Sequence, residues 1–179
     1  MGNSQPYDER PGSAKVKANW TKTRGLVNRE DWSMSIVRAA ICVELAANLT
    51  IHILLKDEKT PDEVDKLLVS LTGLEKKLTL IVKKTKGTEH HASASSARKE
   101  VKVLKRTRNQ IVHGGIFANE SEALALISDA YTAVTTLVLM FEPEFALKAI
   151  VSSTHERTKN RKTRTDESNV SDSDSPSRY

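Results

Sequence analysis

The sequence has one cysteine, few aromatic residues and few glycines. A single cysteine, Cys42, excludes an intramolecular disulfide framework and any zinc site built from cysteines. Aromatic residues make up 4% of the 179 residues and glycines number 7. Sandwiches and barrels are typically built from aromatic-rich strands and glycine turns. The composition therefore argues against an all-β protein.

Long apolar runs are also scarce. The first residues lack the apolar stretch of a secretory signal. The best candidate for a membrane span, which needs roughly 18 apolar residues, is interrupted by Arg38, Glu44 and His52. With 28 Lys and Arg against 23 Asp and Glu, the net charge is +5, which favours an anionic partner. We expect a soluble cytoplasmic protein with no membrane partner.

Composition divides the chain into three zones. Residues 1–28 are rich in basic and polar residues without a sustained apolar period, so we expect a flexible basic arm. Residues 29–150 carry helical periodicity and are expected to form one helical domain. Residues 151–179 contain almost no apolar side chain, which predicts a disordered polar tail.

The apolar spacing within the central zone predicts an all-α fold, a four-to-five-helix up-and-down bundle. Capping patterns and terminal glycines delimit four expected helices, at about 31–56, 60–81, 97–113 and 119–141. Residues 87–96 are expected to form a loop. The pattern also permits the last helix to continue past Pro143 to residue 150. Residues 132–140 are β-branched enough for a strand, but their length and the upstream cap favour a helix. The first and last helices are apolar on more than one face, which predicts cover by the bundle and by a second subunit.

The helix expected at residues 97–113 carries the most informative pattern. Cationic, amide and imidazole side chains recur every three or four residues on one face, at Lys102, Lys105, Arg106, Asn109 and His113. Arg108 lies at the border of this face. The guanidinium of Arg108, the amide of Asn109 and the titratable imidazole of His113 are together suited to bind a phosphate group. The negative end of the helix dipole favours a protonated His113, as a proton donor requires.

The segment Arg108-Asn109-Gln110-Ile111-Val112-His113 resembles the R-x4-6-H motif of the HEPN superfamily (higher eukaryotes and prokaryotes nucleotide-binding) in its R-N-x-x-x-H form. The resemblance covers about residues 31–150 and implies a HEPN-type bundle. Many members are dimeric, metal-independent endoribonucleases, and many are toxins or antiphage components. The resemblance implies RNA as the substrate, a homodimer, and no cofactor or metal. Any antitoxin or nucleotidyltransferase partner would be a separate protein.

Under this resemblance the reaction is transesterification by the RNA 2′-hydroxyl. Arg108 stabilises the added negative charge, His113 moves the proton, Asn109 supports both, and Lys102, Lys105 and Arg106 bind RNA. Glu44, on the first expected helix, is a secondary catalytic candidate. It either points into the same cleft or forms the solvated edge of an amphipathic helix together with Asn48 and His52.

Two alternatives remain at this stage. One is a non-catalytic HEPN-like dimeric module, similar in kind to the mannitol-operon repressor family, that binds a partner or nucleotide. The other is a helical interaction protein in which the basic ends bind the partner. Other residues are poor site candidates: His90 and His91 lack further ligands at metal-site spacing, and Cys42 lacks an activating base.

Overall fold

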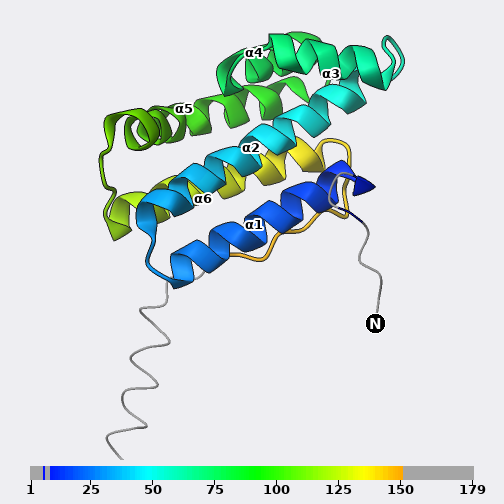
Figure 1. The fold of residues 1–179 in the computed structure, drawn as a ribbon. Helices are drawn as coiled ribbons and strands as arrows, with labels where there is room; N and C mark the ends of the chain where they lie inside the picture. Colours follow the sequence, from blue (N-terminus) through cyan, green and yellow to red (C-terminus); the bar gives the residue numbers. More distant parts are fainter. Residues whose placement is uncertain (1–5, 7–8, 151–179) are drawn as a thin grey trace, which may run out of the picture. The chain divides into compact units, whose positions relative to one another are not determined.

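The computed structural model describes residue 6 and residues 9–150, and these contain six helices and no strand. The helices are α1 (Gly12–Asn28), α2 (Trp32–Leu55), α3 (Pro61–Ser70), α4 (Leu74–Lys84), α5 (His91–Gly114) and α6 (Glu120–Leu139) (Figure 1). The predicted all-α class is confirmed, but the expected count of four to five helices is wrong, since the described residues contain six. Residues 132–139 are helical, as the capping pattern indicated. The predicted tail, 151–179, lies outside the described residues.

Helix α2 is the centre of the fold. It packs against each of the five other helices, and Figure 1 shows it with α6 between α1 and the α4–α5 pair. Asp31 caps its first turn, where Oδ1 accepts a hydrogen bond from the Met34 amide at 3.2 Å. The buried apolar side chains of α2 are covered by helices of its own chain, whereas Met34 in its first turn is 44% exposed. Alanines at the contacts, Ala39, Ala46 and Ala47, are fully buried.

The expectation of a flexible arm at residues 1–28 is wrong for its greater part, because residues 12–28 form α1. Val16, Trp20 and Val27 are spaced by four and seven residues, so they share one face of the helix, and all three are buried. Trp20 also donates an indole hydrogen bond to the carbonyl of Lys148 at 2.8 Å. Three well-placed apolar residues hold this helix despite its polar composition.

The single helix expected at residues 60–81 is two helices, α3 and α4. Gly73, with a φ of 85°, turns the chain between them and stands at the N-cap of α4. The predicted capping box is present, since Thr60 and Glu63 exchange side-chain and backbone hydrogen bonds. The backbone hydrogen bond from Thr60 lowers the pKa of Glu63 below its usual value.

Helix α5 begins six residues before the expected start, at His91 instead of Ala97, so most of the expected loop at 87–96 is helical. It ends as predicted at the glycine pair, where Gly115 adopts the left-handed conformation with a φ of 65°. Asn119 caps α6 by accepting the Glu122 amide at 2.9 Å.

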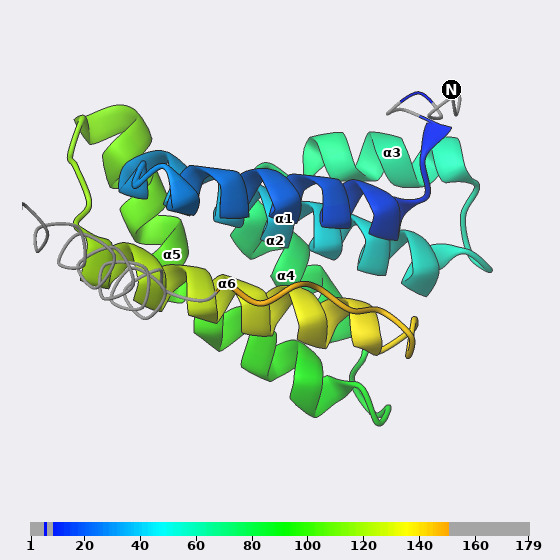
Figure 2. The same cartoon turned by 90° about the horizontal axis from the view of Figure 1, so that it is seen from below.

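The suggested continuation of the last helix to residue 150 is wrong. Helix α6 ends at Leu139, ahead of Pro143, and residues 145–149 are not helical. Instead this segment runs back along α6 towards α1 (Figure 2). Phe145 and Leu147 are buried, and the Lys17 ammonium lies 5.1 Å from the Phe145 ring centre. The segment thus holds α1 against the rest of the fold.

Candidate nucleic-acid interface

An open groove of about 1080 Å³ runs along α5 on the side of α4. Helix α4 contributes Glu75 and Val82 to its wall. The remaining lining residues belong to α5: Ser95, Arg98, Lys99, Lys102, Lys105, Arg106, Asn109, Gln110, His113 and Gly114. Their spacing of three or four residues is that of one helix face. The structure therefore brings together the predicted Lys102, Lys105, Arg106, Asn109 and His113.

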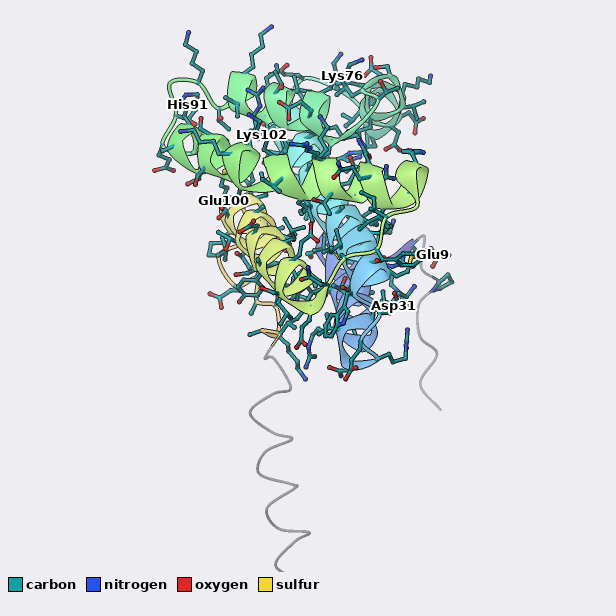
Figure 3. All side chains as sticks on the ribbon, turned by 90° about the vertical axis from the view of Figure 1, so that its left-hand side faces the viewer. Glu9, Asp31, Lys76, His91, Glu100 and Lys102 are labelled. Atoms are coloured by element: carbon teal, nitrogen blue, oxygen red, sulfur yellow. The ribbon has the colours of Figure 1, made fainter. Side chains whose placement is uncertain are left out.

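The two sides of α5 carry side chains of opposite charge. Five cationic side chains and one carboxylate, that of Glu75, line the groove. In Figure 3, Lys102 lies on the side of α5 next to α4, whereas Glu100 lies on the side next to α6. There, partial burial and then the charge of Glu100 raise the pKa of Asp129. The acidic pair and the basic groove thus occupy opposite sides of one helix.

His113 lies at the open C-terminal end of the groove. It is exposed, and Gly114 and Gly115 follow it directly. Its surroundings leave the ring accessible to a ligand in the groove.

Arg108 lines a different, smaller pocket of about 330 Å³, together with Glu44, Leu74, Lys105 and Asn109. Its Nη1 donates a hydrogen bond to Oδ1 of Asn109 at 3.0 Å. Lys105 and Asn109 line both this pocket and the groove. Within one chain, the two motif residues Arg108 and His113 therefore face neighbouring cavities that share a wall.

The structure places Glu44 in the pocket of Arg108 but not in the groove that ends at His113, and it pairs Glu44 with a different residue. The Nζ of Lys77, on α4, donates to Oε1 of Glu44 at 2.6 Å. The Lys77 side chain is only 8% exposed, against 40% for Glu44. A nearly buried ammonium needs this carboxylate as its counter-ion. The contact therefore gives Glu44 a structural role between α2 and α4.

We expect Glu44→Ala to lower the free energy of unfolding by about 1–3 kcal/mol, because it leaves Lys77 buried without a counter-ion. The loss should be smaller than for a fully buried pair, since solvent screens the exposed part of Glu44. Urea denaturation measures it. The double variant Glu44→Ala/Lys77→Met, which removes both charges, should recover part of the loss. A Glu44→Ala protein as stable as the parent would contradict the structural role.

The remaining candidate residues, Cys42, His90 and His91, make contacts that are typical of structural residues. Burial raises the pKa of the Cys42 thiol to about 11, so it is no nucleophile at neutral pH. His91 contacts the Val82 carbonyl at 3.2 Å, and His90 packs edge-on against Phe141. Within the described residues, no cluster of three or more His, Cys, Asp or Glu side chains is placed to bind a metal ion.

Sequence reasoning missed the far end of the groove, at Arg98 and Lys99. Both residues precede Lys102 by three or four positions, so the periodicity that selected Lys102 extends to them. Both also lie inside the helix expected at 97–113, so this signal was available in the sequence. Glu75 was missed because α4 is brought beside α5 by tertiary packing, which no local pattern encodes.

Two helices, α2 and α6, are long and apolar enough to cross a membrane when judged by length and composition. The charges of Arg38 and Glu44 therefore do not exclude a span by these criteria, contrary to expectation. The core helix of a soluble protein passes the same test, and α2 and α6 form much of the buried core. This likeness is weak evidence for a membrane protein.

Comparison of the chain with protein-family models, with curated proteins and with solved structures finds no match.

Proposed function

We propose that this chain is a HEPN-type, metal-independent endoribonuclease that acts in the cytoplasm as a homodimer. The observation that carries the proposal is the groove along α5, in which five cations lead to Asn109 and an exposed His113. Arg108 lies next to it, across the wall formed by Lys105 and Asn109. Cationic side chains suit the phosphates of RNA, and the groups beside them suit its chemistry.

In the proposed reaction, the 2′-oxygen of a ribose attacks the adjacent phosphorus. A bond forms between the 2′-oxygen and phosphorus while the bond to the 5′-oxygen breaks. Arg108 stabilises the negative charge that accumulates on the phosphoryl oxygens. A protonated His113 donates its proton to the departing 5′-oxygen, and solvent accepts the proton of the 2′-hydroxyl. The products are a 2′,3′-cyclic phosphate and a 5′-hydroxyl end.

A second copy of the chain is the occupant that we propose for an apolar surface beside His113. Phe117 is 91% exposed and adjoins a hollow of about 400 Å³ lined also by Met34, Ile111 and Ile116. This surface offers both a protruding aromatic side chain and an apolar hollow, as a self-complementary twofold interface requires. Such a dimer would bring the Arg108 and His113 residues of two chains to one interface.

Cleavage of RNA in EDTA tests the proposal. Purified protein incubated with a fluorescent RNA in excess EDTA should yield fragments with 2′,3′-cyclic phosphate ends, which mass spectrometry identifies. RNA containing deoxyribose at every position should stay intact because it lacks the nucleophile. Fragments with 3′-hydroxyl ends, or activity that EDTA abolishes, would contradict the proposed chemistry.

The separation of Arg108 and His113 between two cavities in one chain favours a second candidate, a non-catalytic HEPN-like dimeric binding module. Such a module would bind RNA or a nucleotide in the groove without cutting it. Growth arrest on expression, relieved by His113→Ala, would support a nuclease that acts as a toxin or antiphage component. Binding without cleavage, unchanged in the same variant, would support the module.

A further inference from the structure

The groove between α4 and α5 is long, basic and poor in stacking partners. From Arg98 to His113 it follows fifteen residues of α5, about 22 Å at the rise of an α-helix. A stacked strand, with an axial rise of about 3.4 Å per phosphate, would place up to roughly six phosphates along this length. The groove therefore reaches well beyond the single phosphate that Arg108 and His113 would handle.

The chemistry of the lining distinguishes backbone recognition from base recognition. No Phe, Tyr or Trp is among the described residues that line the groove. Proteins that hold single strands by their bases use aromatic side chains as stacking surfaces, and these contribute much of the affinity. Lysine and arginine side chains, which line this groove from Arg98 to Arg106, bind phosphates irrespective of sequence.

At the end of the groove opposite His113, one cation already has an anionic partner. Both Nε and Nη2 of Arg98 donate to a single oxygen of Glu75, Oε1, at 2.7 and 2.5 Å. The two side chains are 42% and 38% exposed, so solvent and ligands reach them. A partly exposed ion pair of this kind contributes little to stability. A phosphate group presents the same acceptor oxygens to a guanidinium as this carboxylate does.

We propose that the α4–α5 groove binds RNA through its backbone phosphates irrespective of base sequence, and that Glu75 is an internal counter-ion which an RNA phosphate displaces from Arg98. This inference rests on the proposed function for the identity of the ligand. It adds Arg98, Lys99 and Glu75 as binding determinants about 22 Å from the reacting group.

The first test measures binding without cleavage. Fluorescence anisotropy is recorded with 2′-O-methyl oligonucleotides of about a dozen nucleotides, all-U and all-A, between roughly 50 and 200 mM salt. The two Kd values should agree within about threefold, and the affinity should fall with salt at a slope near −3, as about four or five neutralised phosphates predict. Lys99→Ala and Lys102→Ala should each reduce the magnitude of the slope by about 0.7 to 1.

The second test isolates the counter-ion. Glu75→Gln should tighten binding about threefold to fivefold at low salt, as the strength of an exposed ion pair suggests. In an Arg98→Ala background the same change should have a smaller effect, because Glu75 then has no guanidinium to release and acts only as a negative charge in the groove. Glu58→Gln is the matched control: Glu58 pairs with Lys84 at 2.5 Å, outside the groove lining, and its loss changes the net charge equally.

Each outcome decides a stated part of the inference. A difference above about tenfold between all-U and all-A would overturn sequence-independent recognition, and equal effects of Glu75→Gln and Glu58→Gln would overturn the counter-ion role. Absence of binding, or salt-dependence slopes unchanged by Lys99→Ala and Lys102→Ala, would overturn the proposal that this groove binds RNA, even if the protein cuts RNA. Binding as described without any RNA cleavage would support RNA binding in the groove and would contradict the proposed nuclease activity.

Discussion

We expect His113→Ala to slow RNA cleavage by about 10²- to 10⁴-fold, the contribution of a positioned general acid or base. The imidazole is exposed at the end of the basic groove, so its removal should leave the fold and the RNA-binding cations in place. Single-turnover cleavage of a fluorescent RNA measures the effect. The Kd for an uncleavable 2′-O-methyl RNA should change by no more than about threefold, since most of the phosphate contacts remain.

His52→Ala is the matched control for this variant. His52 is also accessible, but it contacts Asp65 at 3.1 Å on α3 and does not line the groove. Its loss should leave the cleavage rate within about twofold of the parent, as for a surface change away from the site. A His113→Ala protein that cuts RNA as fast as the His52→Ala protein would contradict the catalytic assignment.

The separation of Arg108 from His113 within one chain leads to a complementation test of the dimer. We expect Arg108→Ala alone to reduce cleavage by about 10²- to 10³-fold, as for loss of one group that stabilises a developing oxyanion. If Arg108 of one chain acts with His113 of the other, mixing the two inactive variants should restore activity, because each mixed dimer contains one intact pair. No recovery after subunit exchange would contradict a shared site.

The second large effect concerns stability. We expect Trp20→Ala to lower the free energy of unfolding by about 3–5 kcal/mol, the usual cost of truncating a buried aromatic side chain. Trp20 is 2% exposed, its ring centroid lies 5.7 Å from that of Tyr131 of α6 in a tilted arrangement, and its indole N–H donates to the Lys148 carbonyl. A loss of this size is a large part of the stability of a typical domain. Urea denaturation followed by circular dichroism measures it.

Two controls separate packing from the hydrogen bond. Trp20→Phe keeps most of the apolar contact and loses the indole donor, so it should cost about 1–2 kcal/mol. Trp32→Ala, at the half-buried start of α2, should cost less than Trp20→Ala. A change below about 0.5 kcal/mol for Trp20→Ala is expected of a surface position and would mean that α1 is not held against the fold in solution.

Local signals in the sequence were sufficient for much of the secondary structure. The capping box at Thr60 and Glu63 and the Asn119 cap begin helices because they satisfy backbone groups within a few residues. Gly115 ends α5 because it adopts the left-handed conformation. The cationic face of α5 was also predictable, because helical geometry alone places residues three and four apart on one side.

Tertiary contacts decided what these signals left open. Helix α1 was missed because its three anchors are few, and only α2, α6 and the segment at 145–149 supply the surface that buries them. The break at Gly73 brings α4 beside α5, which creates the groove and pairs Glu75 with Arg98.

The sequence by itself determined that this protein is helical and that one helix carries a cationic face ending in His113, because both follow from spacing along the chain. Only the tertiary structure decided that Glu44 forms an ion pair with Lys77 and that Arg108 and His113 face separate cavities. Such partnerships join residues distant in sequence, and they depend on how helices pack. Packing is governed by shape and burial across the whole fold, which no local spacing records.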